Sequence, residues 1–571
     1  MTTETIVPLE PGAALAPALE QQYEYPETRE LVTLVSDAAE LVRTRGEAAF
    51  AELQMSGSRW RQGERYVFVL DPEGNMLVHP DPALENRNEL NLRDINGKPI
   101  IRGLIEAATA LPERQEGWYH YQWPVPHGLL PRWKSSYVRL VVAPTGKRYI
   151  VGSGVYNDRM ERVFVVDAVS RAAVELERRG TAAFPLFRDP TGPFIVKDTY
   201  IFVTSMEGVE LVNPAFPNLE GRSLLDLTDA HGKHLIREML GVVEVDGVGW
   251  VEYMWPRPGE SVATQKSTYV RKALMAGQPV LVGCGVYLAE APQEVRPAPG
   301  MTASELMTLV REAAAVLAEQ GEKAYPELRR AGSRWRRDDT YLFVWTMNGI
   351  RSLHAADPSM EGEDASGLKD VLGRPAGRMI LEAGATEAGE GWVHYMYPRP
   401  GDIFPIWKSS FVKRVTFPSG IPHIVGCGVY NMRMEKAFIE AMVDRASALI
   451  AERGSEVFPL LRDRTGPFVF MDTYVFVHDT EGTELVNAAL PSLEGRNLLD
   501  LRDLRGRAVI PEQIAAVRSA ESAWLEGSWY KPGDNTPAKK LTYVRKVQWG
   551  GKTWIVGSGI YTDSEPKPDG E

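Results

Sequence analysis

Cysteine, histidine and net positive charge are all scarce in this chain of 571 residues. Two cysteines exclude a disulfide scaffold and any four-cysteine zinc site, and nine scattered histidines do not replace one, so we expect no metal and no cofactor. A formal net charge of −12 repels phosphate backbones, so nucleic acid is not an expected partner. No apolar run reaches the ~18 residues that a membrane span needs, so we expect no membrane insertion.

The composition is otherwise that of a folded protein, with 44% hydrophobic and 25% charged residues. The start of the chain carries Glu4 and Glu10 and has no long apolar run, so we expect no signal peptide there. At about 100–200 residues a domain, the length predicts three to five domains.

An internal repeat divides the chain more finely than its length does. A Val-Gly-Ser/Cys-Gly-Val/Ile-Tyr segment occurs four times, and its closing tyrosines lie 131, 143 and 131 residues apart. This alternation predicts four modules in an A-B-A-B order, built as two copies of a 274-residue pair. The closing tyrosines are Tyr156, Tyr287, Tyr430 and Tyr561.

Each module shows the same order of elements and predicts an α+β fold. A helical stretch, with Leu31, Leu34, Val35 and Ala38 as its first example, precedes a strand-turn-strand unit, an Asp-x-x-Gly-Lys/Arg turn, a short amphipathic segment and three strands. We therefore expect a long N-terminal helix packed on an antiparallel sheet in each module. The expected boundaries are 1–27 for an N-terminal tail, 28–160 and 161–290 for modules one and two, 291–302 for a Pro-rich linker, 303–434 and 435–563 for modules three and four, and 564–571 for an acidic tail.

A lysine recurs three residues before an aromatic residue at the start of the second of these closing strands. Because a solvated lysine has little positional requirement, its retention in four copies favours a fixed charge that faces a small anion, between aromatic walls. The alternative is a lysine whose stem covers aromatic faces and makes a cation–π contact. The lysines are Lys134, Lys266, Lys408 and Lys540, and the tryptophans at the start of the preceding strand are Trp118, Trp250 and Trp392.

Two further positions are candidates for the same site. Tyr121, Tyr253 and Tyr395 share one strand position, and Gly527 replaces them in module four, which we interpret as degenerate for binding. The second position lies thirteen residues after the tyrosine that opens each strand-turn-strand unit. It holds His79 and His354 in the A modules and asparagine in the B modules, and a structural role for these side chains remains an alternative.

We do not expect the Gly-x-Gly segments to form a dinucleotide-binding site. Their third glycine is missing, and each segment ends a module rather than starting one, so small residues that let a strand approach a helix are the expected explanation. Cys284 and Cys427 fall in the same slot of different modules and should be buried free thiols. With no nucleophile or metal motif in the chain, we expect a protein that is not an enzyme.

The segments Tyr66–Pro80, Asp94–Gly97, Trp118–Pro124, Lys134–Val138 and Val151–Tyr156 together resemble a single Cache domain, the sensor type of bacterial chemoreceptors and sensor kinases. The resemblance extends to four tandem copies and implies a helix on a curved, PAS-like sheet whose pocket binds short carboxylates or amino acids. By position, it implies ligand-binding residues in each module. These are Lys134, Tyr121, His79 and Trp118; Lys266, Tyr253 and Trp250; Lys408, Tyr395, His354 and Trp392; and Lys540.

Three functions are consistent with these residues. The first is a soluble sensor of small organic anions that acts in signal transduction, with a separate signalling protein as a further partner. The second is a structural or interaction array with degenerate pockets, and the third is an enzyme that uses the Gly-x-Gly turn. A cytoplasmic location is expected for the chain as written, and an extracytoplasmic one for a trimmed or mature form.

Overall fold

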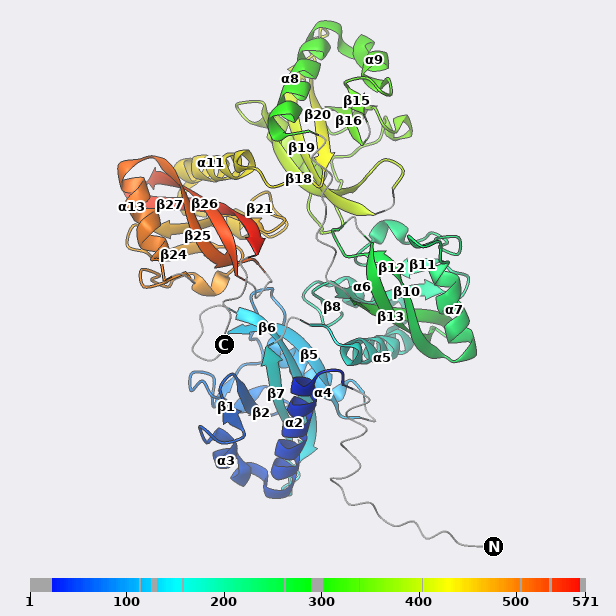
Figure 1. The fold of residues 1–571 in the computed structure, drawn as a ribbon, viewed down its shortest axis with the longest axis vertical. Coiled ribbons are helices and arrows are strands. Elements are labelled where there is room, and N and C mark those ends of the chain that lie inside the picture. Colours follow the sequence, from blue (N-terminus) through cyan, green and yellow to red (C-terminus); the bar gives the residue numbers. More distant parts are fainter. Residues whose placement is uncertain are drawn as a thin grey trace. The chain divides into compact units, whose positions relative to one another are not determined.

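The computed structural model describes residues 23–564 except 112–113, 125–130, 157–158, 261–262, 289–300, 338, 403, 504–505 and 533–536. The chain divides into two compact units, one of residues 1–255 and 264–290 and the other of residues 256–263 and 291–571, so the first holds module one and most of module two. Most of the expected tails and of the Pro-rich linker lie outside the described residues, and the module boundaries stay predictions. Figure 1 shows the four modules, each with a long helix packed beside a sheet.

The long helix of module one, α2 (Pro26–Arg45), forms because its apolar residues recur at three-and-four spacing. Leu31, Val35, Ala38 and Val42 are buried on one side, and Gly46 ends the helix at a φ of 58° that side chains other than glycine rarely adopt. The same design recurs in the other modules. The helices are α5 (Arg162–Arg179), α8 (Ala303–Gln320) and α11 (Lys436–Arg453), each followed by a short helix, and the short helices are α3 (Phe50–Gln54), α6 (Phe184–Arg188), α9 (Tyr325–Arg329) and α12 (Phe458–Arg462).

The sheets confirm the predicted antiparallel architecture, and their strand order is the same in all four modules. In module one the path β3-β2-β7-β6-β5 is antiparallel throughout. The strands and second helix of module one are β1 (Arg61–Gln62), β2 (Arg65–Leu70), β3 (Asn75–Val78), β4 (Arg87–Asn88), α4 (Ile100–Thr109), β5 (Glu116–Pro124), β6 (Pro131–Val142) and β7 (Arg148–Tyr156). Those of module two are β8 (Ile195–Val196), β9 (Thr199–Tyr200), β10 (Phe202–Ser205), β11 (Glu210–Val212), α7 (Leu235–Val245), β12 (Val248–Pro256), β13 (Ala263–Met275) and β14 (Gln278–Tyr287).

The second unit repeats this arrangement. Module three contains β15 (Arg336–Arg337), β16 (Thr340–Thr346), β17 (Arg351–His354), α10 (Ala376–Ala385), β18 (Glu390–Pro398), β19 (Pro405–Thr416) and β20 (Pro422–Tyr430). Module four contains β21 (Val469–Phe470), β22 (Thr473–Tyr474), β23 (Phe476–Asp479), β24 (Glu484–Asn487), α13 (Val509–Ser519), β25 (Ser522–Tyr530), β26 (Pro537–Trp549) and β27 (Lys552–Ser564).

Each sheet has two apolar faces, because successive strand residues point to opposite sides. On β2, Val67 and Val69 pack with the residues of α2, whereas Tyr66 and Phe68 pack with those of α4 on the other face. The sheet therefore lies between a long helix on one side and a shorter helix on the other, and we call the two sides the long-helix face and the short-helix face.

Within each unit, a buried cation joins the first module to the second. Lys98, in the Asp-x-x-Gly-Lys turn of module one, donates from Nζ to the carbonyl oxygens of Gly192 and Ile195 in module two. Its counterpart Arg374 in module three donates to two carbonyl oxygens of module four, those of Gly466 and Val469.

In the part of the chain that the structure describes, no helix combines the length and apolar character needed to cross a membrane. No group of three or more His, Cys, Asp or Glu side chains there is arranged to hold a metal ion.

Candidate functional site

The recurring lysine lies on the short-helix face, in the middle of the sheet. Lys134 on β6 stands in register with Tyr121 on β5 and Tyr156 on β7, and its side chain is 1% exposed. Its Nζ donates to the hydroxyl oxygen of Tyr66 on β2 at 2.7 Å and lies 4.0 Å from the centre of that ring. The equivalent bonds in modules two to four are Lys266–Tyr200 at 3.1 Å, Lys408–Tyr341 at 2.7 Å and Lys540–Tyr474 at 3.2 Å.

Two of these lysines are buried without an ion-pair partner among the described residues. Among the described residues, no carboxylate lies within ion-pair distance of Lys134 or Lys408. Burial, which penalises the charged form, lowers the pKa of each to about 7. Each ammonium group therefore holds its proton weakly near neutral pH, and a bound anion would favour the protonated form.

The Gly-x-Gly segment makes room for this lysine, which corrects the explanation expected from the sequence. Both glycines lie inside β7, and a Cβ on Gly154 would come under 3.0 Å from the side chains of Lys134 and Ser136. A Cβ on Gly152 would clash in the same way with the ring of Phe68. The glycines therefore serve contacts within the sheet on its short-helix face, not the approach of a strand to a helix.

The residue between the two glycines points to the long-helix face. Cys284 and Cys427 occupy this slot in modules two and three, where both are buried free thiols packed in the long-helix cores.

Tyr121 and His79 add neutral donors beside the lysine. The hydroxyl of Tyr121 lies 3.1 Å from Ser136 Oγ, and the corresponding pairs are Tyr253–Thr268 and Tyr395–Ser410. The Nδ1 atom of His79 accepts from the backbone N–H of Asp81 at 3.0 Å, so the ring proton resides on Nε2. His354 accepts from the backbone N–H of Asp357 in the same way, at 2.9 Å. Burial lowers the pKa of both histidines to about 4, so they are neutral donors at pH 7.

The tryptophans of the expected site lie on the wrong face of the sheet. Trp118 packs with Tyr23, Tyr137 and Phe164 under the long helices, and Trp250 and Trp392 occupy the same place in their modules. Strand parity is the reason: Trp118 and Tyr121 are three residues apart on β5, so their side chains point to opposite faces. The aromatic walls on the short-helix face are instead Trp123, Trp255, Tyr397 and Trp529.

Each module has a cavity on its short-helix face. Lys408 and Lys540 line theirs, whereas Lys134 and Lys266 reach theirs only through Tyr66 and Tyr200, which line them. In modules one, two and three, the volume open to the centre of a water-sized sphere is about 20 Å³, and in module four it is about 60 Å³. About 10–15 Å³ by this measure holds one water molecule, so the first three cavities are nearly filled. Gly527 lines the large cavity where the other modules have a tyrosine. From the sequence this glycine suggested a module that is degenerate for binding, but in the structure it lines a larger cavity than those of the other three modules.

Sequence reasoning missed one lining position that differs in charge between modules. Ten residues after the tyrosine that opens each first strand, the chain carries Met76, Glu210, Arg351 and Glu484, and each lines its cavity. The constant offset was a usable signal, but the four residue types share no chemistry that would have attracted notice.

Comparison with known proteins agrees with this architecture. A family model described as "Cache domain" matches residues 193–435 and 437–567, and one described as "Single Cache domain 2" matches residues 39–164. The chain is 33% identical over 93 residues to the methyl-accepting chemotaxis protein McpP of Pseudomonas putida, a match that covers 16% of each chain. It is 37% identical over 93 residues to the sensor histidine kinase MctS of Rhizobium johnstonii, covering 16% of this chain and 19% of the kinase.

The match therefore spans less than a fifth of the length of both curated relatives. Among solved structures, a methyl-accepting chemotaxis protein from Vibrio parahaemolyticus is 31% identical, with 22% of this chain and 87% of that chain covered and a TM-score of 0.20.

Proposed function

The chain belongs to the Cache domain family, and on that premise we propose that it is a sensor of small organic molecules with four tandem Cache modules. In modules one and three, the ligand that we propose is a small organic anion, most simply a short carboxylate. The observation that carries this proposal is the pair of buried lysines, Lys134 and Lys408, which face no carboxylate among the described residues.

The groups around each lysine suit an anion and disfavour a cation. In module one, the Lys134 ammonium group, the Tyr121 hydroxyl and the His79 Nε2–H are all donors around one side of the sheet. In module three, Arg351 also lines the cavity, and its guanidinium pairs with Glu363 at 2.7 Å. A carboxylate accepts several such donors at once, and a charged hydrogen bond away from water is stronger than a neutral one.

Ligand binding in these modules must be coupled to movement. A cavity with room for about one water molecule cannot hold a carboxylate without displacing part of its wall. In module one that wall includes Ile100, Ile101 and Leu104 of α4. A ligand that binds only the opened state shifts the population toward it, which is the property that a sensor requires.

The test is a calorimetric titration of the full chain with acetate, propionate, lactate and pyruvate. We expect two anion sites a chain, one after Lys134→Met or Lys408→Met, and none after both substitutions. Lys147→Met removes an exposed lysine that pairs with Glu47, and should leave both sites intact. An affinity unchanged in the double variant would contradict the proposal.

A second candidate function, a structural or interaction array, is favoured by how nearly filled three of the cavities are. It predicts no heat with any of these anions and a complex whose mass, measured by light scattering, increases with protein concentration. The two functions therefore give opposite results with the same preparation.

We further propose that the signal leaves through a separate signalling protein and that the chain itself is not catalytic. The curated relatives are a chemotaxis receptor and a histidine kinase, and the match covers 16% and 19% of their lengths. Absorbance titration with a nicotinamide or a flavin should give no saturable change, and saturation would favour the enzyme alternative.

A further inference from the structure

The residue ten positions after each opening tyrosine distinguishes the cavities of the A modules from those of the B modules. In module one it is Met76 and in module three Arg351, so the lining adds no negative charge to the lysine. In modules two and four it is a glutamate, Glu210 on β11 and Glu484 on β24. In module four, Lys540 and Glu484 line the same cavity, whereas in module two Glu210 lines the cavity and Lys266 does not.

In module two the carboxyl group is satisfied by the protein itself. Glu210 accepts from Thr204 Oγ1 and from Asn213 Nδ2, both at 2.7 Å, one on each oxygen. The cavity beside it has room for about one water molecule. Module two thus offers a ligand no free acceptor on this carboxyl group.

In module four one of these two partners has been lost. Asn487 Nδ2 still donates to Oε1 of Glu484 at 2.8 Å, but the residue equivalent to Thr204 is His478, whose Nε2 lies 3.0 Å from Gln513 Oε1 instead. Oε2 of Glu484 is buried and has no hydrogen-bond partner among the described residues. Burial raises the pKa of Glu484 to about 8, and the hydrogen bond from Asn487 and the charge of Lys540 oppose this shift. A ligand that donates to Oε2 would therefore favour the ionised carboxylate. A buried oxygen without a partner carries a desolvation cost that a ligand donor would remove.

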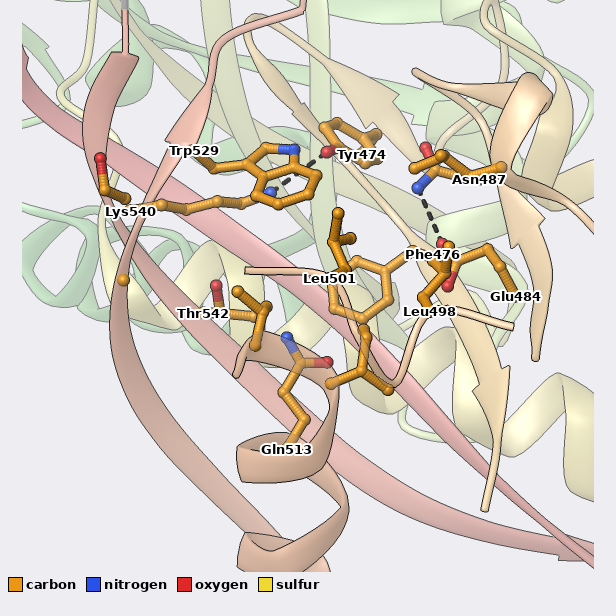
Figure 2. A pocket seen from close by; sticks show the side chains of 15 residues that line it. Tyr474, Phe476, Glu484, Asn487, Leu498, Leu501, Gln513, Trp529, Lys540 and Thr542 are labelled. Carbon is orange, nitrogen blue, oxygen red and sulfur yellow. Dashed lines mark hydrogen bonds between the residues drawn. The ribbon is translucent and has the colours of Figure 1, made fainter. Parts of the chain in front are cut away.

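The same module has the space for a ligand. Gly527 takes the place of the tyrosine found in the other modules, and the cavity volume is about 60 Å³ by the measure used above. Figure 2 shows Lys540, which reaches Tyr474, and Glu484, which contacts Asn487, among the side chains that surround this cavity. Tyr474 is the one hydrogen-bond acceptor of Lys540 Nζ among the described residues, and an ammonium group has three donors.

We propose that module four binds a small organic molecule without net charge, whose N–H group donates to Glu484 Oε2 and whose oxygen accepts from Lys540 Nζ. An anion would meet the carboxyl group and a cation would meet the ammonium group, so a molecule with a donor end and an acceptor end fits both. A small zwitterionic amino acid and a small amide share this chemistry. The inference rests on the proposed function, because it takes the cavities of this chain as ligand sites.

The experiment titrates the full chain with glycine, β-alanine, acetamide and urea, with acetate as the anionic comparison. We expect one site for a net-neutral probe, and the probe that binds distinguishes a zwitterion from an amide. Glu484→Gln replaces the free acceptor with an amide group, and Gly527→Tyr refills the cavity, so each should weaken binding at least tenfold. Glu210→Gln, the matched change in module two, should leave the affinity unaltered.

The double variant Lys134→Met with Lys408→Met separates this inference from the proposed function. It should lose the anion sites and keep the site for the neutral probe, so each idea can fail alone. Three results would overturn the inference: no neutral probe binds, binding survives Gly527→Tyr, or acetate occupies the site that Gly527→Tyr removes. If Glu484→Gln does not fold, as judged by circular dichroism, Gly527→Tyr decides the question.

Discussion

Lys134 is buried and has no carboxylate within ion-pair distance among the residues that the structure describes, a combination that costs free energy in the folded protein. A buried lysine gives up its hydration, and the hydroxyl of Tyr66 and the surrounding rings replace only part of it. Gly154, which has no Cβ, leaves the space that this side chain occupies. Lys408 repeats this costly arrangement in module three, which supports the proposed role in ligand binding over packing alone.

The first prediction at this scale concerns pH. The pKa of Lys134 is lowered to about 7 when folded and is about 10.4 in an unfolded chain, so between these values the unfolded state binds more protons. The free energy of unfolding should therefore rise with pH, by about 1.4 kcal/mol per pH unit for this lysine. We expect this slope in the difference between wild type and Lys134→Met in urea unfolding from pH 7.5 to 9.5. Lys147→Met, at an exposed lysine that pairs with Glu47, is the matched control for the loss of a lysine side chain.

The second prediction concerns the glycine beside that lysine. Gly154→Ala places a Cβ under 3.0 Å from the Lys134 and Ser136 side chains, and we expect a loss of about 1–3 kcal/mol from overpacking. Gly241→Ala is the matched control, because nothing lies within 4 Å of its Cβ and the residue is inside α7. It should stabilise by about 0.4–1 kcal/mol. Equal midpoints of thermal unfolding for the two variants would contradict the packing argument.

At the scale of elements, the sequence predicted the helices and strands well because their patterns are local. The three-and-four spacing of α2, the hairpin of β2 and β3, and the three closing strands all lie where the residues indicated. Parity within a strand was also available, and it would have excluded Trp118 once Tyr121 was placed on the short-helix face. No local pattern indicated that Gly527 lines a large cavity. The volume of a cavity depends on which side chains of the sheet and of α13 meet, and these residues lie far apart in the sequence.

The prediction at this scale concerns the turn that joins two modules. Lys98→Met removes the donor to the carbonyl oxygens of Gly192 and Ile195, and each carbonyl left buried without a partner costs about 1–3 kcal/mol. In the full chain, we expect the unfolding midpoint of the first unit to fall and that of the second unit to stay unchanged. Lys233→Met is the matched control, since Lys233 donates to Glu252 within its own module and is partly exposed. A midpoint that falls equally in both variants would show that the contact between modules contributes nothing.

At the scale of the whole molecule, four copies of one fold carry different residues around the cavity on the short-helix face. The sequence repeat alone predicted the number and order of modules, because the landmarks keep register over the full length of the chain. It could not predict which cavities are open, since the volume of each depends on side chains from several elements together.

The position occupied by Met76, Glu210, Arg351 and Glu484 has a consequence for how such a protein diversifies. After a gene segment is duplicated, one substitution on this strand changes the charge that a cavity offers and leaves the lysine, the glycines and the sheet as they were. A chain built in this way can enlarge its chemical repertoire one module at a time, while the other copies go on performing the original task.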